Sequence, residues 1–168
     1  MSNPLLDTLT QEASIDGIID VFLDVDALRR DIGEAFDADE TRYIEEALAD
    51  ITLITGLEFN FVEAEGSSEL SFHKIDVDQG GLEAWGVEEG AVGLATPSRE
   101  KDHNVIYFEE VVDEALQEAV MYHEIGHVFG LEHPSDPSVM MSQSIMSYNL
   151  DEFLGFTADD VMAFNEIW

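Results

Sequence analysis

The sequence predicts a single α+β domain, on three observations. The chain has 168 residues, of which 45% are hydrophobic, and this suits one sizeable core. Several short stretches rich in branched and aromatic residues have the character of strands. Between and after them lie longer segments whose apolar residues repeat at helical spacing.

In the N-terminal part, Pro4–Gln11 predicts a short helix and Ile18–Val25 a first strand. The segment Asp39–Thr55 predicts a long helix, because its apolar residues recur at helical spacing. Asp37 or Asp39 is available as the N-cap, and Gly56 lies just past the end.

Three further strands and two helices complete the predicted order. Leu57–Glu63 alternates apolar and polar residues, which predicts a strand with one buried face. Glu69–Ile75 and Asn104–Glu109 predict two more strands. A helix should then run from Val112 or Asp113 to about Phe129, and Asp159–Trp168 should close the chain as an amphipathic helix. The helix before residue 129 is expected to bury Leu116, Ala119, Val120 and Val128.

The segment from residue 123 to residue 133, HEIGHVFGLEH, is the most informative part of the chain. His123 and His127 are four residues apart, so on a helix their imidazoles lie on one face and can bind one ion. His133 reaches that ion only if the chain turns back after His127, and Gly130 permits such a turn. Three nitrogen ligands with an open fourth position are typical of catalytic zinc, so the pattern predicts a zinc site.

Glu124 follows the first histidine and projects about 100° around the helix from it. Its carboxylate should therefore lie beside the water in the fourth position and not on the metal. Zinc lowers the pKa of such a water to about 7, which makes Glu124 the candidate general base for attack on a carbonyl.

This motif resembles the extended zinc motif of the metzincin metallopeptidases. That family adds a methionine in a tight turn beneath the metal, and the segment SIMSY is similar to it, with Met146 as the turn methionine. Pro134, directly after the third histidine, and Tyr148, two residues past Met146, are similar to the serralysin branch. The resemblance implies that the Tyr148 hydroxyl helps to stabilise the oxyanion.

Met141 is a rival for the turn methionine. The segment Asp136–Met141 resembles the matrixin pattern, in which the methionine turn follows soon after the third histidine. We favour Met146, because Tyr148 follows it at the family spacing and Leu154–Val161 then resembles the start of the closing helix. The methionine not used in the turn would fill the core.

The resemblance also implies an architecture. It predicts a twisted, mainly parallel mixed sheet with an antiparallel edge strand, a zinc-site helix and a small C-terminal subdomain. One catalytic domain would span residues 1–168, with its C-terminal subdomain starting near residue 131. The stretch from Gly80 to Pro97 resembles the edge strand, in which Gly93, Leu94 and Ala95 are expected to pair with extended substrate backbone.

The chain is strongly acidic, with 38 acidic residues against 6 basic ones and a formal net charge of −32. Such a chain repels nucleic acid and anionic membranes, so neither is an expected partner. Like-charge repulsion destabilises the compact state at low salt, and added salt screens it. The composition indicates adaptation to a saline setting; the alternative is that peptidases of this kind are simply acidic and hold calcium.

Other features narrow the interpretation. The chain has no cysteine, so it has no disulfide framework and cannot use the propeptide cysteine that keeps matrixins latent. It shows neither a bilayer-spanning apolar run nor a signal peptide, so we expect either that the chain is a mature fragment or that its export signal lies elsewhere. Asp76 and Asp78 offer oxygen ligands to calcium, although such pairs are common in solvated loops. His73 and His103 are expected to be ordinary structural residues.

Taken together, these features predict a secreted, monomeric zinc endopeptidase that acts on extended polypeptides. Two alternatives stay open. One is a degenerate metzincin that binds zinc and protein without cleaving. The other is a metal-dependent hydrolase of small amides, which would need an enclosed pocket in place of a long cleft.

Overall fold

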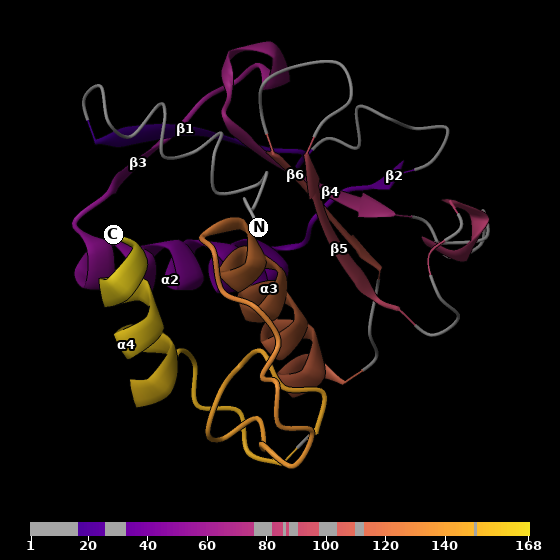
Figure 1. Ribbon diagram of the computed structural model, residues 1–168. Coiled ribbons are helices and arrows are strands. Elements are labelled where there is room, and N and C mark those ends of the chain that lie inside the picture. Colours follow the sequence, from indigo (N-terminus) through magenta and orange to yellow (C-terminus); the bar gives the residue numbers. More distant parts are fainter. Residues whose placement is uncertain are drawn as a thin grey trace.

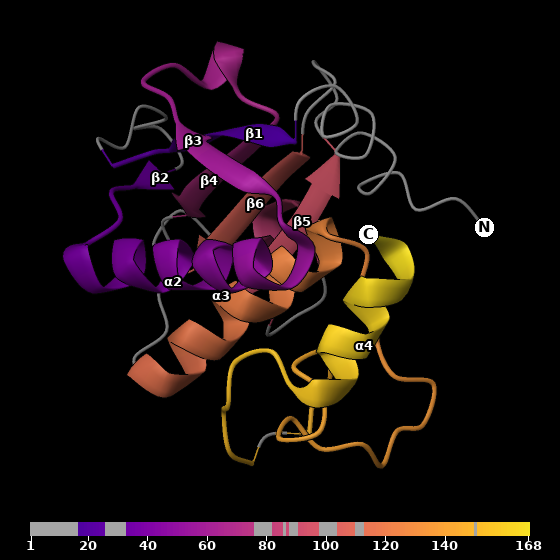
Figure 2. The ribbon, with the colours of Figure 1, turned by 90° about the vertical axis from the view of Figure 1, so that its left-hand side faces the viewer.

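A computed structural model describes residues 17–25, 33–75, 82–85, 87, 91–97, 104–109, 113–149 and 151–168. Within them a six-stranded sheet is covered on one face by two long helices, α2 (Ala38–Thr55) and α3 (Glu114–Val128). Figures 1 and 2 show both helices on the same side of the sheet. The segment that follows α3 lies beyond these helices, together with the last helix, α4 (Ala158–Ile167). The predicted α+β class is confirmed.

The sheet is mainly parallel, as expected. Its strands lie in the order β3 (Glu58–Phe61), β1 (Ile18–Leu23), β4 (Leu70–Ile75), β6 (Asn104–Glu109), β5 (Gly93–Pro97). The first four pair in parallel, whereas β5 runs antiparallel to β6 at the edge. The short strand β2 (Gly33–Glu34) pairs antiparallel with the end of β4. The predicted antiparallel edge strand is therefore present, and it is the part of the sheet that contacts α3 most extensively.

Helix α2 begins and ends where its sequence predicts. Asp37 caps it by accepting hydrogen bonds from the backbone N–H groups of Asp39 and Glu40, while Glu40 accepts one from the Asp37 N–H. Gly56 ends it in the left-handed conformation (φ 79°), which costs a residue without Cβ little. Its buried face contributes Tyr43, Ile44, Ala47, Leu48 and Ile51 to the core between helices and sheet.

Helix α3 is capped by Asp113 and ends at Phe129. Gly130 then adopts φ 100°, and its N–H donates to the carbonyl of His127. This is the turn expected after His127. Helix α4 is capped by Thr157, whose hydroxyl accepts from the Asp160 N–H. Two 3₁₀ turns, η1 (Glu65–Ser67) and η3 (Leu82–Trp85), lie in the loops.

Two burial predictions are wrong in part. Leu57, just before β3, is buried and Phe59 is partly buried, but Phe61 is 48% exposed, because β3 is an outer strand of the sheet. On α3, Ala119 and Val128 are buried as expected, whereas Leu116 and Val120 are only partly covered. The predicted N-terminal helix at Pro4–Gln11 lies outside the described residues.

Candidate metal centre

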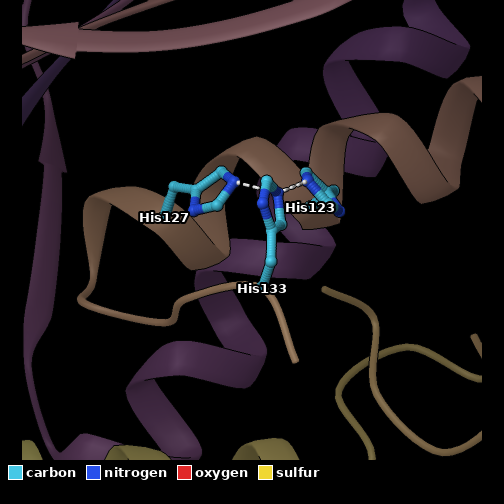
Figure 3. Close-up of side chains that lie close together, drawn as sticks. All are labelled: His123, His127 and His133. Atoms are coloured by element: carbon cyan, nitrogen blue, oxygen red, sulfur yellow. Dashed lines mark hydrogen bonds between the residues drawn. The ribbon is translucent and has the colours of Figure 1, made fainter. Parts of the chain in front are cut away.

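Three histidines come together at the C-terminal end of α3. His123 and His127 lie one turn apart on the helix, and His133 returns to them after the turn at Gly130. The Nε2 atom of His133 lies 3.1 Å from Nε2 of His123 and 3.0 Å from Nε2 of His127 (Figure 3). One nitrogen from each ring falls within 4.8 Å of the others, so the trio can share one ion.

The other ring nitrogens fix the tautomers of two of these histidines. Nδ1 of His123 lies 2.9 Å from the carbonyl oxygen of Ile145, and Nδ1 of His127 lies 3.0 Å from that of Leu131. A carbonyl oxygen only accepts, so each Nδ1 carries the proton. On a neutral ring Nε2 then presents a lone pair, and the two lone pairs converge on His133.

Burial keeps the rings neutral. It lowers the pKa of His123 to about 4, against the opposing effect of the hydrogen bond to Ile145. Burial also lowers the pKa of His127 and of His133. Nitrogen ligands about 2.0–2.1 Å from a tetrahedral zinc lie roughly 3.4 Å apart, close to the observed separations. The three nitrogen donors therefore fit zinc, whose positive charge would offset the repulsion between the converging lone pairs.

Glu124 lies on α3 beside the trio and is 91% buried, with 9% of its surface exposed. Burial raises its pKa to about 7, although a hydrogen bond from the Ala95 backbone N–H acts in the opposite direction. The edge strand β5 thus contacts the carboxylate directly. A Cβ atom on Gly93 would lie 2.6 Å from Cγ of Glu124 and 2.7 Å from Oε1, so only glycine leaves room for this side chain.

The segment after His133 brings Met146 and Tyr148 to the site. Met146 is buried beneath α3, with its sulfur 2.8 Å from where a Cβ on Gly126 would lie. The Tyr148 ring is 73% exposed, with its centroid 4.5 Å from that of His133 and 5.4 Å from that of His123. Met141, the rival methionine, is also buried but lines a cavity next to Glu124.

That cavity has a volume of about 320 Å³ and opens beside His123 and Glu124. Its walls are mainly apolar, and they explain the partial exposure of Leu116 and Val120. Sequence analysis missed this role. The signal was present, because Leu116 and Val120 precede Glu124 by eight and four residues and so share its helix face. The further apolar wall residues are Ala91, Val92, Ala119 and Met141.

The two remaining histidines and the pair Asp76 and Asp78 lie elsewhere or outside the described residues. His73 is buried, with Nδ1 3.1 Å from Asp24 and Nε2 3.2 Å from Glu65, so opposite sides of the ring are engaged in hydrogen bonds. His103, Asp76 and Asp78 are not among the described residues, and the trio is the one metal-capable cluster found within the described ranges.

The fold and the histidine trio define a class, the zinc metallopeptidases with an extended histidine motif on a helix. A family model described as Matrixin matches residues 27–168. The chain therefore belongs to the matrixin family, whose members are zinc metallopeptidases. The predicted metzincin-type catalytic fold is thereby confirmed. No curated protein matches this chain. Within the described residues, no helix is long and apolar enough to cross a membrane.

Proposed function

We propose that this protein is a zinc endopeptidase with His123, His127 and His133 as the metal ligands. The observation that carries the proposal is the convergence of three neutral imidazoles beside a buried carboxylate. Three protein ligands leave a fourth position for chemistry, whereas structural zinc is normally closed by four. When bound, zinc would polarise the substrate carbonyl and lower the pKa of the attacking water.

Glu124 would accept the proton of that water and pass it to the leaving amine. Burial raises the pKa of Glu124 in the metal-free protein, and a carboxylate beside the metal position can accept a proton and later return it. Tyr148 lies over His133 at the mouth of the site, where its hydroxyl would donate to the oxyanion. Both roles depend on substrate lying across the trio.

The edge strand β5 would hold the substrate. Among the described strands it pairs with β6 alone, so its other edge can add an extended peptide through backbone hydrogen bonds. Gly93, Leu94 and Ala95 lie at this edge, next to Glu124. The apolar cavity lined by Leu116, Val120 and Met141 would then receive one substrate side chain beside the scissile bond. The arrangement favours a large apolar side chain at that position.

The first test compares wild type with Glu124→Gln and with Glu45→Gln, a matched change on the exposed face of α2. Unfolded casein is the substrate, at high salt, with and without a zinc chelator. We expect chelator-sensitive cleavage that falls by at least about 100-fold in Glu124→Gln and is unchanged in Glu45→Gln. Folded, zinc-loaded wild type without cleavage would instead support the degenerate, zinc-binding alternative.

A peptide-length series separates the endopeptidase from a small-amide hydrolase. Substrates trimmed one residue at a time at both ends should lose kcat, because binding to β5 contributes to the transition state. A constant kcat down to a dipeptide amide would favour the small-amide hydrolase.

We propose, further, that the protein works in a saline setting. The net charge of −32 leaves most carboxylates without a cationic neighbour. The urea concentration at the unfolding midpoint should therefore rise between 0.1 M and 1 M NaCl, with an unchanged m-value. A midpoint that is independent of salt would reject this proposal.

We also propose that the chain forms a single catalytic domain, and that the protein is secreted and monomeric. Ca²⁺ is a candidate second ion. Matrixins are often extracellular, and the acidic surface disfavours self-association. Detection in cell-free culture medium tests secretion, and light scattering during size-exclusion chromatography tests the oligomeric state. Retention of the protein in cells would contradict secretion, and the mass of a dimer would contradict the monomeric state.

A further inference from the structure

Asp160, in the first turn of α4, is a buried carboxylate that the proposed reaction does not use. It does more than cap its own helix. Oδ2 accepts from the Thr157 N–H at 2.9 Å and from the Ile145 N–H at 3.0 Å. Oδ1 accepts from the Ser144 hydroxyl at 2.7 Å. The carboxylate thus connects the start of α4 to the turn that contains Met146.

Ile145 connects that carboxylate to a metal-site histidine. Its N–H donates to Asp160, and its carbonyl oxygen accepts the Nδ1 proton of His123. The turn is closed by a hydrogen bond from the Ser147 N–H to the Ser144 carbonyl, and the Met146 N–H donates to the Ser144 hydroxyl oxygen. Residues 144–147 are therefore held from both sides, by Asp160 and by their own backbone.

We propose that Asp160 is a positioning residue for the metal centre. By fixing the Ile145 backbone, it holds the carbonyl oxygen that keeps the His123 proton on Nδ1 and directs the Nε2 lone pair toward the other histidines. Groups that orient a metal-binding histidine through its second ring nitrogen tune metal affinity by about 10–100-fold. The inference rests on the proposed zinc site, and it assigns a role in zinc affinity to a residue outside the histidine motif.

Three variants separate a purely structural role of Asp160 in capping α4 from its proposed role in positioning His123. Thr157→Ala removes the hydroxyl that caps α4 and that donates to the Gln143 carbonyl oxygen, but it leaves the bond between Asp160 and Ile145 in place. Asp160→Ala removes the acceptor for Ile145 as well. Asp160→Asn keeps an oxygen that can accept from the Ile145 N–H, and its amide N–H₂ can donate to the Ser144 hydroxyl oxygen. The three variants therefore distinguish loss of the cap from loss of the link to His123.

The test measures zinc affinity by competition with a chromogenic chelator, in variants whose folding is verified by circular dichroism. We expect Asp160→Ala to bind zinc about tenfold more weakly, Asp160→Asn to restore most of the affinity, and Thr157→Ala to match wild type. The ¹⁵N shifts of the His123 ring in metal-free protein give a second readout. They should report the Nδ1–H tautomer in wild type and a mixture of tautomers in Asp160→Ala.

Wild-type affinity and tautomer in a folded Asp160→Ala variant would overturn the proposal, as would an equal loss of affinity in Thr157→Ala. His123→Ala separates this failure from failure of the zinc site itself. If wild type binds zinc no better than His123→Ala does, the proposed function is wrong. If wild type binds zinc more tightly than His123→Ala does, and Asp160→Ala binds zinc as tightly as wild type, the metal centre is correct but Asp160 does not position it.

Discussion

The two parts of the molecule that supply the metal centre are held together in different ways. The sheet with α2 and α3 is stabilised by a continuous apolar core and by regular backbone hydrogen bonds. Residues 131–157 contain no helix or strand among those described. Few of their side chains join the core (Leu131, Met141, Ile145 and Met146 do), and side chains bonded to backbone groups hold the rest of the segment in place. Two histidines come from the first part, and His133, Met146 and Tyr148 come from the second. Helix α3, in the first part, sets the spacing of His123 and His127, whereas the irregular second part supplies His133.

The largest effect should follow from a cavity in the apolar core. Ile51 on α2 is fully buried, so Ile51→Ala should reduce the free energy of unfolding by about 2–5 kcal/mol. Urea denaturation measures this loss. The control is Leu53→Ala on the same helix, since Leu53 is 84% exposed and its truncation should change the free energy by less than about 0.5 kcal/mol. Equal effects of the two changes would show that α2 does not pack as described.

A smaller but more specific effect should arise within the first part, where the edge strand β5 contacts Glu124 on α3. In Gly93→Ala the new methyl group would overlap Glu124, so the carboxylate must move. A displacement of about 1 Å costs roughly 100-fold in rate, so kcat/KM should fall by about that factor while zinc affinity stays unchanged.

Leu94→Ala is the control for Gly93→Ala, because Leu94 packs against the other face of the sheet, with Val105 and Tyr107. It should change stability more than rate. Wild-type kcat/KM in Gly93→Ala would show that Glu124 does not need its observed position.

The smallest effect should come from a single polar contact in the irregular part. The Asn149 amide donates to the carbonyl oxygens of Pro137 and Val139, at 2.6 Å and 2.8 Å. Asn149→Ala should reduce the free energy of unfolding by about 1 kcal/mol and speed hydrogen exchange in residues 135–149.

Asn165→Ala makes a matched comparison, because that amide bonds only within its own helix, to Val161. Its exchange effect should stay within α4. Unchanged exchange around residue 140 in Asn149→Ala would show that other contacts suffice to hold the segment.

Local sequence patterns were enough to predict most of the secondary structure and the clustering of His123, His127 and His133. The capping residues Asp37 and Gly56 act within a few residues of their own positions, and so does the i, i+4 pair His123 and His127. The exposure of Phe61 was not predictable in this way, because it depends on which strand lies at the outer edge of the sheet.

By itself, the sequence determined the family, the order of helices and strands and the residues able to bind zinc, because each of these depends on residue type at short spacing. Only the tertiary structure decided that Gly93 lies against Glu124, that Met141 joins Leu116 in the wall of one cavity, and that Asp160 reaches Ile145. These contacts join residues from separate elements, brought together by strand pairing and helix packing. No local pattern encodes such contacts.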